Sequence, residues 1–140
     1  MCEHKFEVIE HTADKGIRAY GDTPAQALES AAYAMFSLMA DLELYKPERV
    51  TEISIEAQDA QVLLHNWLSE LLFYFEVERV LPVGFKVVEF AEWRVRAEIA
   101  VRPIGPDIQW LGSEVKAITY HELKFEERDD QWMAQAIVDV

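Results

Sequence analysis

The sequence predicts an α+β fold in which two helices pack on a largely antiparallel sheet or on a sandwich of sheets. Apolar residues recur at helical spacing in two segments, whereas most of the remaining chain alternates apolar and polar residues as half-buried strands do. The predicted order of elements is β-β-α-β-α-β-β-β-β. With 140 residues, 51% of them hydrophobic, the chain suits a single domain with one core over residues 1–140.

The N-terminal part predicts a hairpin followed by a helix. Residues 6–11 and 16–21 are short strand-like segments around a loop at residues 12–15. Thr23 then offers an N-cap, with proline at the first helical position and glutamine three residues after the cap. We therefore expect the first helix over residues 24–40.

A strand and a second helix are expected next. Ile53, Ile55 and Ala57 alternate with polar residues, as in a strand with one solvated face. Asp59 is a suitable N-cap for a helix that places His65 on its polar, solvated side. The same helix carries one apolar stripe that is expected to face the core: Leu64, Trp67, Leu68, Leu71, Leu72 and Phe75.

The C-terminal part predicts four strands. Residues 85–87 and 93–101 show period-two patterning. Two further strands, at 117–127 and 131–140, surround Asp129-Asp130, which are placed as a two-residue hairpin turn.

The composition limits the classes of function. The chain has 26 acidic and 13 basic residues and a formal net charge of -13, so direct nucleic-acid binding is not expected. If the protein acts on RNA, it is expected to do so through a partner protein with a basic surface. The alternative interpretation is that the acidity only keeps the protein in solution. The lone Cys2, with only His4 nearby, makes neither an intramolecular disulfide nor a zinc site. No segment has the ~20 apolar residues of a membrane span and no signal peptide is evident, which predicts a cytoplasmic protein.

The end of the last strand brings two carboxylates together, those of Asp139 and of the chain terminus at Val140. With a two-residue turn, the register places Asp139 opposite Tyr120. Val140 then lies opposite Thr119, and Lys116 lies about three residues further, roughly 10 Å along the strand, from where its side chain reaches back. The alternative is a frayed chain end with an ordinary solvated aspartate.

Other polar residues have ordinary structural interpretations. The segment His11-Thr12-Ala13-Asp14 is typical of a tight loop, in which Thr and Asp bond local amides. His121 shares a strand face with Leu123 and Phe125, so a hydrogen-bonded histidine at the edge of the core is expected. No Ser-His-Asp or Cys-His spacing and no glycine-rich phosphate loop is present. We therefore expect no catalytic machinery.

Three segments resemble the archease family: Glu10-His11-Thr12-Ala13-Asp14, the stretch from Glu114 to His121 with its Lys-Ala-Ile-Thr-Tyr-His string, and the ending from Trp132 to Val140. The resemblance extends over nearly the whole chain. It implies an accessory protein, not an enzyme, that assists the GTP-dependent RNA ligase of the RtcB type in tRNA splicing and RNA repair. In that family the accessory protein promotes guanylylation of the ligase and its multiple turnover.

The resemblance also implies a site. A divalent metal ion, calcium in the family, is held by the loop aspartate and the last two residues, which are here Asp14, Asp139 and Val140. Calcium prefers 6 to 8 oxygen ligands at about 2.3–2.6 Å, which agrees with carboxylates at this position. The lysine that supports ligase activation corresponds to Lys116. The residues expected to support the site loop are His11, Thr12 and His121.

The chain departs from the family pattern at two places. Lys15 follows Asp14 where an aliphatic residue is usual, which adds positive charge near the expected cation. The stretch 103–112 is short, and Trp110 stands near a position where histidine is frequent.

Two alternatives to the ligase accessory remain. A general chaperone or modulator of RNA-modifying enzymes would act through apolar surface instead of the carboxylates. A metal-dependent hydrolase would need an open coordination position and a histidine base to activate water.

Overall fold

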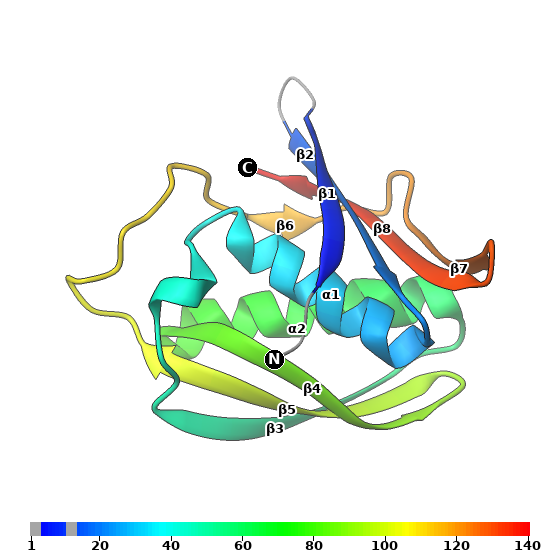
Figure 1. The fold of residues 1–140 in the computed structure, drawn as a ribbon, viewed down its shortest axis with the longest axis horizontal. Helices are drawn as coiled ribbons and strands as arrows, with labels where there is room; N and C mark the ends of the chain where they lie inside the picture. Colours follow the sequence, from blue (N-terminus) through cyan, green and yellow to red (C-terminus); the bar gives the residue numbers. More distant parts are fainter. Residues whose placement is uncertain (1–3, 11–13) are drawn as a thin grey trace.

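The computed structural model describes residues 4–10 and 14–140 and confirms the α+β class. Two helices lie between two antiparallel sheets, so each helix has a sheet on both sides (Figure 1). The element order is the predicted one, except that the expected strand at 117–127 is divided into two. His11 and Thr12, expected to support the site loop, lie outside the described residues.

The first sheet joins the two ends of the chain. Its strands are β1 (Lys5–Glu10), β2 (Asp14–Gly21), β8 (Gln131–Asp139), β6 (Ala117–Ile118) and β7 (Lys124–Arg128). Their order is β1-β2-β8, and β6 and β7 both pair with the remaining edge of β8. The β1–β2 hairpin and the β7–β8 hairpin occur where the sequence predicts them, and Arg128 pairs with Gln131 around the two-residue turn.

The second sheet is local in sequence. It contains β3 (Arg49–Glu56), β4 (Val80–Ala91) and β5 (Arg94–Pro103), in the order β3-β5-β4. β4 begins before the predicted 85–87 segment, and bulges interrupt its pairing with β5. These bulges break the period-two pattern, which explains why only part of the strand is visible in the sequence.

Both helices begin at the predicted caps. The N–H of Gln26 donates to the Thr23 side chain (3.1 Å) at the start of α1 (Pro24–Ser37). The helix stops three residues earlier than predicted, because residues 38–40 turn toward the short 3-10 helix η1 (Leu42–Leu44). The Asp59 carboxylate accepts from the N–H of Val62 (2.9 Å) at the start of α2 (Ala60–Glu78).

Trp67 connects the two helices at the centre of the core. Its side chain is fully buried, and its indole Nε1–H donates to the backbone carbonyl of Leu28 in α1 (2.9 Å). A buried indole needs such an acceptor, so this bond fixes α2 against α1 as well as filling space. In the part of the chain that the structure describes, no helix is long and apolar enough to cross a membrane.

We expect Trp67→Ala to lower the free energy of unfolding by about 3–5 kcal/mol, because it leaves a large cavity between the helices. Urea denaturation followed by circular dichroism measures this loss. Val50→Ala is the control, since Val50 is 62% exposed and its truncation should change stability by less than about 0.5 kcal/mol. Equal losses in the two variants would contradict the role given to Trp67.

Candidate functional site

The candidate site lies where β2, β8 and β6 meet at one end of the first sheet. Asp14 is the cross-strand partner of Asp139, and Ala117 pairs with Asp139 on its other side. Directly opposed residues of antiparallel strands share a face, with Cβ atoms about 4.5–5.5 Å apart. The two carboxylates therefore share a face of the sheet. Asp139 is exposed, whereas the Oδ1 atom of Asp14 is shielded from solvent.

The end of β8 is held on both sides. The N–H of Lys116 donates to the carbonyl of Asp139 (2.8 Å), and Asp14 pairs with Asp139 on the opposite edge. Val140 is partly buried and packs against the core. The chain end is therefore not frayed in this structure, although Asp139 is exposed, as that alternative expects.

The predicted register at this point is also wrong. Asp139 lies opposite Ala117, not opposite Tyr120, so the pairing is shifted by three residues from the prediction. Residues 119–123 leave the ladder as a loop, in which Glu122 has a positive φ of 50°. The shift brings Lys116 next to the strand end, nearer than the roughly 10 Å expected from the unbroken strand. Its side chain is exposed.

Lys15 does not share the face of the two carboxylates. It pairs with Val138, and successive residues of a strand point to opposite faces. Its Nζ donates to Ser113 Oγ (2.8 Å) and lies 3.9 Å from Glu10 Oε1. The expected conflict between Lys15 and a cation at Asp14 is thus reduced, because the ammonium is bound on the other side of the sheet.

Two histidines differ from their predicted settings. His121 is exposed in the 119–123 loop and contacts Glu122 (3.1 Å), instead of sharing a core-edge face with Leu123 and Phe125. His65 is not solvated: its Nε2 bonds the carbonyl of Ile118 (3.1 Å), and its ring stacks on Tyr120 with centroids 4.0 Å apart. Because a carbonyl only accepts, the Nε2–H of His65 is the donor in this bond. No pattern in the sequence indicates this contact between α2 and β6.

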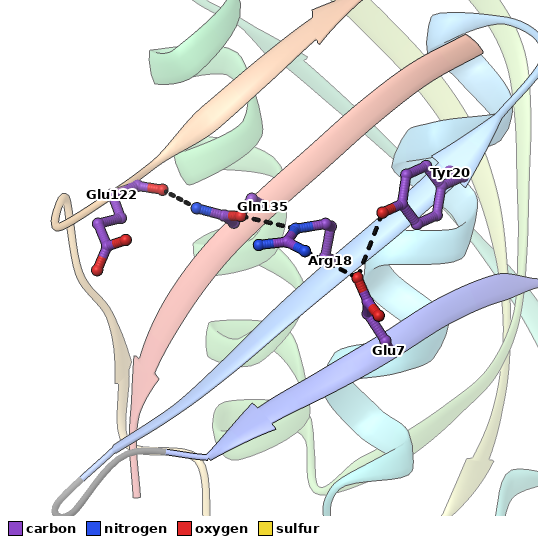
Figure 2. Close-up of polar contacts among 5 residues, drawn as sticks. All are labelled: Glu7, Arg18, Tyr20, Glu122 and Gln135. Carbon is purple, nitrogen blue, oxygen red and sulfur yellow. Dashed lines mark hydrogen bonds and ion pairs between the residues drawn. The ribbon is translucent and has the colours of Figure 1, made fainter. Parts of the chain in front are cut away.

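A row of side chains crosses the outer face of the same sheet (Figure 2). Gln135 of β8 is only 4% exposed; its Nε2 donates to the carbonyl of Glu122 and its Oε1 accepts from Arg18 Nε, both at 2.9 Å. Arg18 also donates to the Glu7 carboxylate (2.9 Å), which accepts from the Tyr20 hydroxyl (3.3 Å). The row therefore connects β1, β2, β8 and the 119–123 loop.

A second concave region lies at the other end of β2. It has a volume of about 380 Å³ and contains two titratable groups with shifted pKa values. Burial lowers the pKa of His4, which contacts Ser30 Oγ (3.2 Å) and stacks on Tyr33. Burial raises the pKa of Glu29, although the N–H of Val87 donates to its carboxylate (2.8 Å) and opposes the shift. Both groups have structural partners, so this region is not our candidate site.

The metal ligands expected from the sequence remain a prediction. Within residues 4–10 and 14–140, no three His, Cys, Asp or Glu side chains gather as a group able to hold a metal ion. The expected set contains only two such side chains, Asp14 and Asp139, and takes its third ligand from the main chain at Val140. Carboxylate oxygens are the donors that calcium and magnesium prefer, so the chemistry of this set fits a hard divalent cation.

A family model described as the archease protein family matches residues 6–140. The chain belongs to the archease family. The protein archease of Methanopyrus kandleri is 41% identical over 138 residues, which cover 96% of this chain and 99% of the relative. That of Methanosarcina acetivorans is 36% identical over 140 residues, with 97% and 96% covered.

Solved structures show the same fold. The solution structure of Methanobacterium thermoautotrophicum protein 1598 has a TM-score of 0.81 and 30% identity, and the match covers 96% of this chain and 98% of that chain. A crystal structure from Thermotoga maritima, described as an archease and possible chaperone, has a TM-score of 0.66 and 19% identity, with 99% and 100% covered. At that identity, the likeness shows the fold alone.

We expect Gln135→Ala to lower the free energy of unfolding by about 1–3 kcal/mol, because it removes two hydrogen bonds made by a side chain that is only 4% exposed, one from Arg18 and one to the carbonyl of Glu122. Thermal and urea unfolding measure the loss. Arg128→Ala is the matched control, since it removes the exposed ion pair with Glu126 (2.9 Å) and should cost at most about 1 kcal/mol. The row has no special role if both variants lose the same stability.

Proposed function

We propose that the protein is an accessory factor of an RtcB-type RNA ligase, which promotes guanylylation and multiple turnover of the ligase and catalyses no reaction itself. Membership of the archease family supports this proposal. The observation that carries it is the meeting of Asp14 and Asp139 on one face of the sheet end, beside the backbone of Lys116.

We assign Asp14, Asp139 and the Val140 carboxylate as ligands of a divalent metal ion, with calcium as the first choice. Like charges directly opposite each other on a sheet destabilise it, and a cation between them offsets this repulsion. A bound divalent ion supplies positive charge that orders the carboxylates and can polarise phosphate oxygens. His11 and Thr12 are assigned a supporting role in the adjoining loop.

The carboxylate end of the first sheet docks beside the active site of the ligase. There Asp14 and Asp139 help to position the metal ions and the triphosphate that guanylylation requires, and Lys116 orients the carboxylates or contacts the ligase. Catalysis stays with the ligase. The help needed is small, because a hundredfold faster step corresponds to about 2.7 kcal/mol of barrier.

The charge of the chain supports an indirect action on RNA. A formal net charge of -13 repels the phosphate backbone and attracts a protein with a basic surface. The ligase binds the RNA, and the accessory protein binds the ligase. A general chaperone for RNA-modifying enzymes is the second candidate, and it is favoured by the exposed apolar residues Trp110 and Leu111, 46% and 60% exposed. The variants below separate the two functions.

We expect the purified protein to accelerate turnover of its cognate ligase at substoichiometric amounts, measured by ligation of excess RNA. Lys116→Ala should reduce this acceleration at least tenfold and change the free energy of unfolding by less than about 0.5 kcal/mol, because the side chain is exposed. Lys46→Ala, another exposed lysine, is the control and should accelerate the ligase normally.

An unchanged ligase rate with the wild-type protein would remove the proposed function. A chaperone that acts through apolar surface would instead protect several RNA-modifying enzymes from inactivation, and Lys116→Ala would protect them as well as the wild type does.

We expect excess calcium to stabilise the wild-type protein by about 2.7 kcal/mol at one hundred times its Kd, since only the folded state binds the ion. Asp14→Asn should abolish this gain, and so should a C-terminal extension, which converts the Val140 carboxylate into an amide. Asp22→Asn and an N-terminal extension are the controls. Equal calcium stabilisation of all these proteins would exclude Asp14 and Val140 as ligands.

A further inference from the structure

A concave apolar pocket lies beside the long connection between β5 and β6, which Figure 1 shows in yellow. Its volume is about 330 Å³. The lining residues come from the turn after α1, from α2 and from the connection: Met39, Phe75, Trp110, Gly112, Ser113 and Glu114. No element of the described chain fills it.

Backbone bonds attach the connection to the residues that follow α1. The N–H of Leu111 donates to the carbonyl of Met39 (2.8 Å), and Trp110 makes an isolated antiparallel bridge with Ala40. The Trp110 ring packs edge-on against Phe75, with centroids 6.1 Å apart. A partner therefore meets a surface that is already arranged, which reduces the entropy lost on binding.

Large apolar side chains at the edge of the pocket are exposed to solvent. Trp110 is 46% exposed and the neighbouring Leu111 is 60% exposed. Adjacent exposed aromatic and aliphatic residues at the edge of a concavity are typical of protein interfaces, where tryptophan contributes much of the binding energy.

Acidic residues lie at and near the pocket. Glu114 is among its lining residues, and Asp41, Glu43 and Glu76 are close in sequence to the lining Met39 and Phe75. Lys15 bonds the lining Ser113, but the chain as a whole has a formal net charge of -13. Asp107 is neutralised by Arg102, with 2.9 Å between Nη1 and Oδ2. The apolar pocket thus fits an apolar side chain flanked by basic residues, whereas the charge opposes stacking of a nucleic-acid base.

The connection that lines the pocket leads to the candidate site along the chain. Ser113 lines the pocket and accepts the hydrogen bond from Lys15 Nζ (2.8 Å), on the opposite side of the sheet from the carboxylates of Asp14 and Asp139. Two residues beyond Glu114, Lys116 bonds the end of β8. A partner that contacts both features therefore has to reach around the end of the first sheet.

We propose that this pocket is the docking site for the ligase, and that it receives an apolar side chain from a basic segment of the ligase surface. The inference rests on the proposed function and assigns its two parts to different surfaces. The Trp110 pocket provides most of the affinity for the ligase, and the carboxylate end activates the ligase. A ligase that binds RNA has the basic surface this requires.

The test measures ligase turnover against the concentration of the full-length protein, together with direct binding to the ligase by calorimetry. Trp110→Ala and Leu111→Ser should each raise the half-saturating concentration and the Kd at least tenfold, with the full rate recovered at saturation. Val77→Ser, which is 56% exposed on α2, is the matched control and should bind normally. Leu111→Ser keeps the test valid if Trp110→Ala is unstable, because the Leu111 side chain is largely in solvent.

Two further variants separate docking from activation. Asp14→Ala should lose activation even at saturating concentration, and its Kd for the ligase should rise less than that of the pocket variants. Glu114→Lys should weaken binding and reduce its dependence on salt, because it removes one attraction to a basic partner.

The outcomes are distinguishable. Docking at this pocket is overturned if both pocket variants bind like the wild type while the wild type activates the ligase, and the proposed function then stands. It is also overturned if the variants lose the saturated rate at unchanged Kd, or if the wild-type protein binds single-stranded RNA through Trp110. If the wild type neither binds nor activates the ligase, the proposed function and the docking site both fail.

Discussion

The pairing of β8 along both edges is the constraint on which the site depends. One edge bonds to β2 and the other to β6 and β7, and all residues from Met133 to Val138 are buried. A slip of one residue would exchange the two faces of β8 and move the polar Gln135 from its partners on the outer face into the apolar core, so the register is strongly fixed. Asp14, Asp139 and Ala117 are therefore aligned by the whole length of the strand. The outer row through Gln135 adds side-chain bonds to the same alignment.

Local signals in the sequence predicted the elements well and the non-local contacts poorly. Asp129 and Asp130 form the predicted turn with φ values of 53° and 65°, and Arg128 pairs with Gln131 as expected. The same register fails on the N-terminal side of Lys124, because the five-residue loop 119–123 interrupts the predicted strand. Glu122 has a positive φ in this loop, and glutamate has no preference for that conformation, so the sequence carried no signal of the interruption.

At the candidate site, too, the residues could be predicted from the sequence but their contacts could not. The family resemblance selected Asp14 and Asp139, and the structure makes them cross-strand partners, which no pattern in one sequence could establish. Alternation along β2 does explain why Lys15 faces away from Asp14, once the strand is known to begin at Asp14. The contact of His65 with Ile118 depends on how α2 packs against β6, and a histidine among polar neighbours on a helix does not reveal it.

The pairing of β2 with β8 also sets the order in which the molecule can be completed during synthesis. The second sheet and α2 lie within residues 49–103, so their contacts can form as soon as that segment has left the ribosome. The first sheet can be completed only after β8 has been synthesised, because Gly21 pairs with Trp132 and Asp14 pairs with Asp139. At about 5–20 residues per second, the N-terminal hairpin and α1 spend several seconds without their central strand. A nascent chain that lacks β8 also lacks Asp139, so the closing of the sheet and the meeting of Asp14 with Asp139 occur in the same event.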